Sequence, residues 1–213
     1  MTVTRSRLGR PVGADGERTR ARILGAAMRC VAEVGYSRAT IRQIARTAEM
    51  TSGSLYHYFP NKSELLDAAA REIQTIALPR LRAAAARTDD VVDRLEAVLE
   101  ESHRLMREYP DLAAFERAIR AESSAAGPGR PAHPGLQVLR DVIGEVVEDA
   151  RARGSLPADI EPGATVDAVY ALTRGLTERA ASLTPGAYAA TLASAKCLLR
   201  GTLFTREPGG PRR

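Results

Sequence analysis

The side chains of this sequence that could act as catalysts or metal ligands do not form the sets that such sites require. Two cysteines are too few for a cysteine zinc site, and none of the three histidines is spaced as one of a metal pair. The adjacent carboxylates Asp89-Asp90 and Glu100-Glu101 would face different sides of a helix. No nucleophile has a base at motif spacing, and no glycine-rich loop could hold phosphates. We expect no catalytic residue, no metal and no cofactor.

A different polar cluster suits contact with nucleic acid. It consists of the small residues Thr51, Ser52, Gly53 and Ser54, followed by Tyr56-His57. At the start of a helix, small side chains allow close approach to a major groove, and the free N–H groups there face phosphates. Ser52 and Ser54 are candidates for base contact. Tyr56 and His57 suit the backbone, although either residue taken alone would as readily be a core or surface side chain.

Short helices must position this cluster. The stripe Ile23, Ala27, Val31 and Val34 predicts a first helix, and Gly35 is placed to end it. The run 40–43, Thr-Ile-Arg-Gln, is a capping box for a second helix. Thr51 would cap a third helix, and Asn61 would open a longer fourth one. Two short helices joined by a tight turn favour a helix-turn-helix.

The rest of the sequence is also helical, with about nine helices in all and no strand alternation, so the predicted class is all-α. Pro and Gly residues predict a loop at 123–135. The predicted organisation is a flexible basic arm at 1–16, a helix-turn-helix domain at 17–63 and a larger helical domain at 64–213. The fourth helix, from 61, joins the two domains. The predicted C-terminal helices are 162–183 and 185–204.

Charge is distributed unevenly along the chain. Residues 1–62 hold eleven basic and four acidic side chains, a balance of +7, whereas residues 63–213 have a balance of −2. The asymmetry favours an N-terminal segment that faces a polyanion, and a solvated basic tail would give the same charge. No run approaches the roughly 18 apolar residues of a membrane span, and the N-terminus lacks the apolar core of a secretory signal. We expect a cytoplasmic protein with no membrane partner.

The segment 23–68 resembles the DNA-binding domain of the TetR family of bacterial repressors, most specifically in SGSLYHYFPNKSELL. The resemblance implies an all-α dimer that binds a double-stranded, pseudo-palindromic operator and is released by a small molecule. The DNA contacts that it implies are Arg18, Arg20, Thr40, Arg42, Thr51, Ser52, Gly53, Ser54, Tyr56, His57 and Lys62. One departure lies in the turn, where Ala48-Glu49-Met50 replaces the usual Ala-Gly-Val. If residue 49 needs a positive φ, Glu costs about 1 kcal/mol relative to Gly.

The same resemblance implies an effector cavity and a dimer interface in the larger domain. Candidate effector-pocket residues are His103, Met106, Tyr109, Phe115, Tyr170 and Arg174. Each also fits a plain structural role, such as core packing for Met106 and Phe115 or an ion pair of Arg174 with Glu178. Candidate dimer-interface residues are Val169, Leu176, Ala180, Leu192, Ala195, Leu199 and Leu203.

The predicted function is a ligand-responsive repressor with a small, hydrophobic effector. A regulatory protein that has lost sequence-specific recognition is an alternative, and a helical enzyme is the least supported hypothesis. DNA affinity that is steeply salt-dependent but without sequence preference would favour the alternative.

Overall fold

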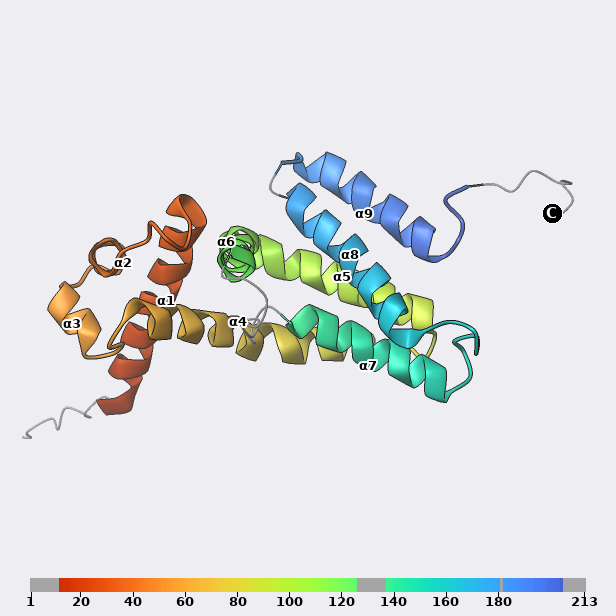
Figure 1. Cartoon of the computed structure of the whole chain (residues 1–213), viewed down its shortest axis with the longest axis horizontal. Coiled ribbons are helices and arrows are strands. Elements are labelled where there is room, and N and C mark those ends of the chain that lie inside the picture. The colour runs from red at the N-terminus through yellow and green to blue at the C-terminus, as the bar shows by residue number, and fades with distance from the viewer. Residues whose placement is uncertain (1–11, 126–136, 181, 205–213) are drawn as a thin grey trace, which may run out of the picture.

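The computed structural model describes residues 12–125, 137–180 and 182–204, and every regular element within them is an α-helix (Figure 1). The nine helices are α1 (Val12–Val34), α2 (Ile41–Thr47), α3 (Ser52–Tyr56), α4 (Lys62–Ala85), α5 (Val91–Glu108), α6 (Leu112–Ala125), α7 (Val138–Ala152), α8 (Pro162–Ala180) and α9 (Pro185–Leu199). The all-α prediction is therefore confirmed. Helices α1 to α3 form one end of the elongated molecule, and α5 and α7 to α9 form the other.

Helices α1, α2 and α3 enclose a small apolar core together with the start of α4; we call these three helices the head. Ile23, Ile44, Leu55 and Leu65 are each fully buried in it. Burying such a side chain stabilises the fold by about 2 kcal/mol before entropy is counted. The Thr40 hydroxyl accepts from the Gln43 N–H at 3.2 Å while the Gln43 side chain accepts from the Thr40 N–H at 3.0 Å, so the predicted capping box is confirmed.

Helix α4 belongs both to the head and to the second half of the molecule, which comprises α5 to α9. It is 24 residues long, or about 36 Å, and begins at the Asn61 cap, whose side chain accepts from the Glu64 N–H at 2.9 Å. Its first turns bury Leu66 against the head, and its later turns bury Leu81 in the second half. A movement of the second half can therefore reach the head through one continuous element.

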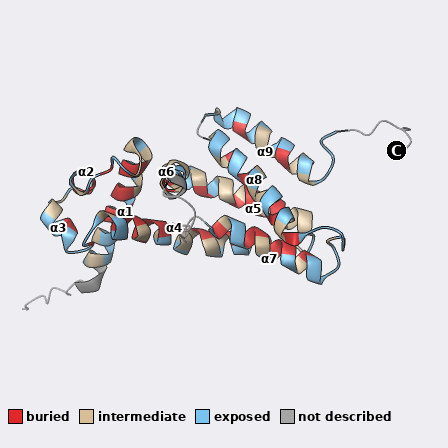
Figure 2. Ribbon diagram, viewed as in Figure 1, coloured by how far each residue is buried: buried red, intermediate tan, exposed pale blue. Residues whose placement is uncertain are grey.

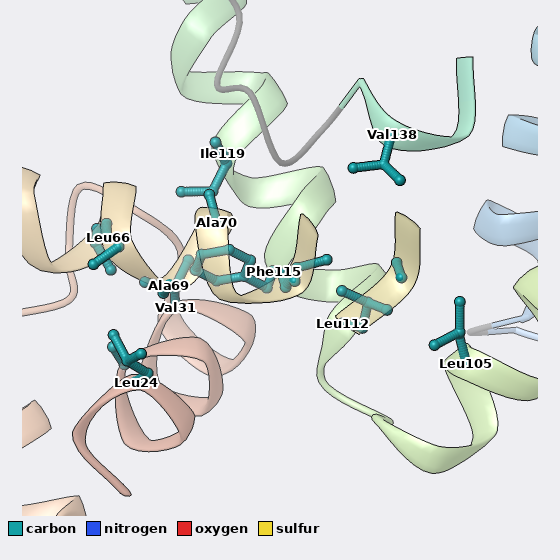
Figure 3. Close-up of a cluster of buried hydrophobic side chains, with 14 of the residues drawn as sticks. Leu24, Val31, Leu66, Ala69, Ala70, Leu105, Leu112, Phe115, Ile119 and Val138 are labelled. Atoms are coloured by element: carbon teal, nitrogen blue, oxygen red, sulfur yellow. The ribbon is translucent and has the colours of Figure 1, made fainter. Parts of the chain in front are cut away.

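Helix α6 completes the connection by packing against α1. Its Phe115 is fully buried and lies beside Ala69 and Ala70 of α4, with Ile119 one turn away (Figure 3). Phe115 is thus part of the common core. It does not line the cavities described below, which corrects its prediction as an effector contact.

Four predicted boundaries differ from the structure, and one of them is the end of α8, predicted at 183 and found at Ala180. Helix α1 begins at Val12, so residues 12–16 are helical, and the remainder of the predicted arm lies outside the described residues. Helix α6 continues to Ala125, which makes 123–125 helical; residues 126–135 of the predicted loop are not described.

Helix α9 ends at Leu199 rather than at residue 204. Gly201 has φ +69°, and the Thr202 N–H donates to the Cys197 carbonyl at 2.9 Å, the pattern of a Schellman stop. Leu203 consequently lies beyond the helix on which its dimer role was predicted.

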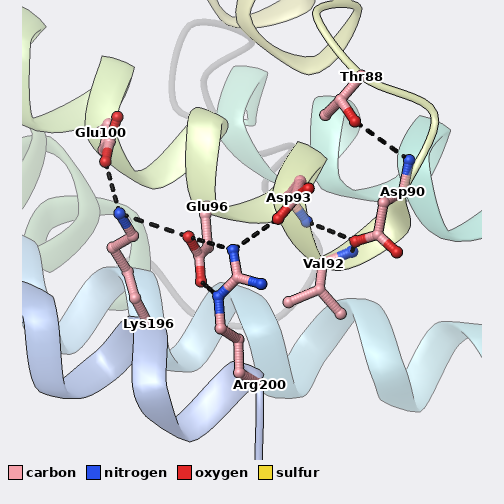
Figure 4. Close-up of polar contacts among 8 residues, drawn as sticks. All are labelled: Thr88, Asp90, Val92, Asp93, Glu96, Glu100, Lys196 and Arg200. Atoms are coloured by element: carbon pink, nitrogen blue, oxygen red, sulfur yellow. Dashed lines mark hydrogen bonds and ion pairs between the residues drawn. The ribbon is translucent and has the colours of Figure 1, made fainter.

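Ion pairs connect α9 to α5 (Figure 4). Lys196 Nζ lies 2.6 Å from Glu100 Oε1, and Arg200 Nε lies 2.6 Å from Glu96 Oε1. Arg200 also binds Asp93. We call these five residues the α9 clasp. No described helix is both long and apolar enough to cross a membrane.

Candidate nucleic-acid interface and internal cavities

The N-termini of α2 and α3 border one surface hollow with a volume of about 540 Å³. Four predicted contacts line it: Thr40, Arg42, Thr51 and Ser52. Arg46, which the sequence analysis did not select, lines it as well and is exposed. The hollow thus combines unpaired helical N–H groups with two guanidinium groups, which is the chemistry of a phosphate site.

Helix α3 is anchored by one residue and exposes most of the others. Leu55 is fully buried beneath it, whereas Gly53, Ser54, Tyr56 and His57 are exposed (Figure 2). Tyr56 leaves 51% of its surface open, which is unusual for an aromatic residue without an external partner.

One hydroxyl group of α3 already has a partner within the chain. The Ser54 hydroxyl is hydrogen-bonded to the Thr51 hydroxyl at 2.9 Å, so a base contact by Ser54 would have to share that bond. Just beyond α3, Tyr58 is 39% exposed and the next residue, Phe59, is buried.

Lys62 lies at the start of α4, as predicted, and its ammonium group has partners that the prediction did not include. Its ammonium group donates to the carbonyls of Tyr36, Ser37 and Ala39 at 2.9, 3.3 and 3.1 Å, and it lies 4.9 Å from the centre of the Tyr36 ring. All three donors of the lysine are therefore engaged within the chain. Lys62 thus joins the start of α4 to the loop before α2, and its role as a phosphate contact stays a prediction.

The two predicted DNA contacts of α1, Arg18 and Arg20, differ in their surroundings. The guanidinium group of Arg20 stacks over the Phe59 ring at 5.2 Å, which fixes it beside the start of α4. Arg18 is exposed on the adjacent turn. Both belong to α1, which lies at the same end of the molecule as α3 (Figure 1).

The turn between α2 and α3 contains backbone strain. Glu49 has φ +55° and is the only non-glycine residue with a positive φ among the described residues. Residue 49 therefore has the positive φ at which Glu costs about 1 kcal/mol relative to Gly. The turn is closed by the Met50 N–H, which donates to the Ala45 carbonyl at 3.0 Å.

The six predicted effector residues separate into four places. Met106, Tyr170 and Arg174 line one cavity between α4, α5, α6, α7 and α8. Tyr109 lines another, between α1 and α4. His103 stacks on Tyr188 of α9 with ring centres 4.5 Å apart, which removes it from either cavity. Phe115 is in the core.

The cavity that contains Met106, which we call the central cavity, is mostly apolar and has a volume of only about 50 Å³. Leu105, Leu112 and Val138 reach it from α5, α6 and α7 (Figure 3). Its polar side is formed by Glu116 and Arg120 of α6 with Tyr170 of α8. The space suits one or two water molecules, so an effector requires the surrounding helices to separate.

On the polar side of the central cavity, Tyr170 was a predicted pocket residue, whereas Glu116 and Arg120 were not predicted. Arg120 donates to Glu116 and to the Tyr170 hydroxyl, both at 3.3 Å. Burial raises the pKa of the Glu116 carboxyl, and Arg120 opposes that rise. The i, i+4 spacing of Glu116 and Arg120 was visible in the sequence, but that pattern is common on solvated helices.

Most of the predicted dimer-interface residues pack against other helices of the same chain. Leu176 and Ala195 are buried with Leu99, and Leu192 and Leu199 pack against them. Val169 packs against the main core and Ala180 is half-buried. Together with the buried Tyr188, which stacks on His103, these side chains attach α9 to α8 and α5.

Comparison with known proteins gives a consistent result. The family model "Bacterial regulatory proteins, tetR family" matches residues 23–69. The regulator UidR of Escherichia coli is 26% identical over 167 residues, which are 76% of this chain and 81% of UidR. The repressor KstR of Mycolicibacterium smegmatis is 36% identical over 120 residues, 54% of this chain and 58% of KstR. The Bacillus subtilis regulator FadR, solved with stearoyl-CoA, has a similar fold, with a TM-score of 0.71 at 16% identity over 86% of this chain and 99% of FadR.

Proposed function

Because this chain belongs to the TetR family of transcriptional regulators, a family of DNA-binding proteins and not of enzymes, we propose that it represses transcription as a ligand-released dimer. The dimer binds a pseudo-palindromic operator in the bacterial cytoplasm. A small molecule with a largely apolar body binds between the helices of the second half and releases the DNA.

The observation that carries the proposal is the surface around α2 and α3. Thr40, Arg42, Thr51 and Ser52 border one hollow, and Tyr56 and His57 are exposed beside it. In the proposed complex the hollow receives a phosphate, and α3 enters the major groove beside it. A helix of five residues reads few base pairs, so useful specificity requires two heads on one operator.

The faces of α8 and α9 that remain exposed support a two-fold dimer. On α8, Ala164, Ala168, Ala171 and Gly175 follow one another at i, i+4, i+7 and i+11, and all four are exposed. On α9 the exposed side is also rich in small residues, namely Gly186, Ala187, Ala190, Ala193 and Ser194. Small side chains allow helices to approach closely, so these faces replace the predicted set as the proposed interface.

Release of DNA follows from the small volume of the central cavity. Ligand sites normally enclose about 300–1,000 Å³, so a ligand binds best to a form in which α6 or α8 has moved away from α4 and α5. Helix α6 packs against α1, and α4 enters the head directly. In the ligand-bound form the two heads of the dimer are then spaced wrongly for the operator.

Selection of DNA fragments by the purified protein at near-physiological salt tests the proposal. We expect enriched fragments to share an inverted repeat whose half-sites are about one helical turn apart. Tyr56→Ala should weaken binding to that repeat by at least tenfold. Ile160→Ala, a truncation of a similarly exposed residue between α7 and α8, should not weaken it.

The strained turn favours one alternative, a regulatory protein with decayed sequence recognition. Glu49 places a carboxylate and a positive φ between the two helices that would meet DNA. In that case binding falls steeply with salt and no repeat is enriched. That pair of results would overturn the repressor assignment.

A further inference from the structure

Three cavities adjoin one another through shared lining residues. The central cavity shares Ala113, Arg120, Arg174 and Thr177 with a hollow of about 250 Å³ between α6 and α8, which we call the mouth. On its other side it shares Ile73, Ala77, Leu105 and Leu112 with a space of about 210 Å³ between α1 and α4, which we call the hinge chamber. Two wider spaces thus lie on either side of a narrow one, and Leu105 and Leu112, labelled in Figure 3, form part of the wall between the central cavity and the hinge chamber.

The mouth carries an excess of positive charge. Arg117 and Arg120 of α6 and Arg174 of α8 line it, with Glu178 as its acidic residue. Arg120 is engaged with Glu116 and Tyr170, whereas Arg174 lies 3.6 Å from Glu178 in a loose pair on an exposed helix face. Among the described residues, Arg117 has no ion-pair partner. Two guanidinium groups on facing helices are therefore available to an anion.

The hinge chamber is apolar and reaches the head. Leu24 and Met28 of α1 and Ile76 of α4 line it, and Tyr109 closes one side. Gly25 leaves room here, because a Cβ at this position would meet no atom within 4 Å. A hydrocarbon group bound in this chamber would bury its apolar walls, and such burial is favourable.

We propose that the effector is an elongated anionic amphiphile whose acidic group binds Arg117 and Arg174 in the mouth and whose apolar tail passes the central cavity into the hinge chamber. The inference rests on the proposed function and specifies its ligand. A tail in the hinge chamber contacts α1 itself, so it separates α1 from α4 at the point where the head joins the second half. The ligand then changes the head directly as well as through α6.

The charge requirement is tested by calorimetry with the purified protein and straight-chain probes below their micelle concentrations. Dodecanoate should bind at least tenfold more tightly than 1-dodecanol, which corresponds to one charge-assisted contact. Arg117→Gln and Arg174→Gln should each lower the affinity for dodecanoate and leave that for the alcohol unchanged. Arg179→Gln is the matched control, since Arg179 is exposed on α8 outside all three cavities. Equal affinity for the two probes, or tighter binding of dodecylamine, would overturn the inference.

The path of the tail is tested by filling the hinge chamber. Across carboxylates of 8 to 16 carbons, Gly25→Leu should move the preferred length to a shorter homologue, because its side chain occupies the chamber. Gly25→Ala, which adds one methyl group, should leave the preference near that of the wild type. An unchanged length preference in a folded Gly25→Leu protein would place the tail elsewhere and overturn this part of the inference.

Binding of the selected operator, measured in parallel without any probe, separates two kinds of failure. If the operator is bound but carboxylates neither bind nor release it, the ligand inference fails and the repressor function stands. If no operator is enriched while the carboxylates bind, the proposed function fails and the ligand site stands.

Discussion

The head is held together by buried aliphatic side chains, whereas α9 is attached to the rest of the chain largely by charged ones. In the head, Ile23, Ile44 and Leu55 have no exposed surface. At α9 the apolar contacts are a small cluster around Leu176 and the stack of Tyr188 on His103, and the clasp adds Lys196 and Arg200. Hydrophobic burial changes little with salt or pH, whereas partly exposed ion pairs weaken as salt rises. The DNA-reading end should therefore keep its shape under conditions that loosen the proposed dimer face.

Leu55→Ala should have the largest effect, because it removes the only buried anchor of α3. Leu→Ala in a closed core costs about 2–5 kcal/mol, and DNA binding should be lost together with that stability. Leu198→Ala, a truncation of a residue that is 49% exposed on α9, should change stability by less than about 0.5 kcal/mol. Urea unfolding measures the stability of both variants. Similar losses for the two variants would refute the contrast between the ends.

Glu96→Gln should loosen α9 and spare the head. Glu96 is only 7% exposed and pairs with both Lys196 and Arg200, so its neutral isostere leaves these cations with Glu100 and Asp93 alone, at a cost of about 1 kcal/mol. Asp93→Asn is the control, because Asp93 is 44% exposed on its side chain and pairs with Arg200 alone. Hydrogen exchange should rise in α9 and remain unchanged in α1. Faster exchange in α1 would show that the two ends are not independent.

Lys62→Gln should distinguish a structural lysine from a DNA contact. Loss of the bonds to the carbonyls of Tyr36, Ser37 and Ala39 should destabilise the head by about 1–2 kcal/mol. The slope of log affinity against log salt should stay at its wild-type value, since no phosphate contact is lost. Arg42→Gln should lower that slope by about one. A lower slope in Lys62→Gln would confirm its role as a phosphate contact.

These residues show where prediction from the sequence succeeded and where it could not. The caps at Thr40, Thr51 and Asn61 act over three residues, so the sequence contains the whole interaction and predicts it. Lys62 donates to backbone carbonyls 23 to 26 residues upstream. Because every residue has a backbone carbonyl, no residue type in the sequence marks these partners.

The second half was predicted less well for the same reason. The mouth depends on Arg117 and Arg174 coming together from α6 and α8, which only the packing determines. The apolar stripes of α8 and α9 were visible, but the sequence does not say whether a stripe packs within the chain or against a second copy. Leu192 and Leu199 pack within the chain and keep part of their surface exposed, so their role at a dimer interface stays a prediction.

Acidification should loosen α9 before it affects the head. Burial, assisted by Arg107, lowers the pKa of His103, whose ring stacks on Tyr188 of α9. A histidine with a lowered folded pKa takes up a proton more readily in the unfolded chain, so stability falls as pH drops below the unfolded pKa near 6.5. We expect the midpoint of thermal unfolding to fall between pH 7.5 and 5.5. His103→Gln should remove the part of this fall that belongs to His103, and identical pH profiles for the two proteins would contradict the assignment.

The smallest effect concerns the one strained residue of the head, Glu49. Glycine at this position removes about 1 kcal/mol of left-handed strain but gives the unfolded chain more freedom, so Glu49→Gly should stabilise the protein by about 0.5 kcal/mol. Glu49→Ala keeps the strain and removes the carboxylate, so it should not raise stability. Both variants should bind the operator more tightly than the wild type, because each removes a negative charge beside the phosphate hollow. Urea midpoints and operator affinities measured together separate the two causes. If the alanine variant is as stable as the glycine one, then charge rather than backbone strain sets the cost of this turn.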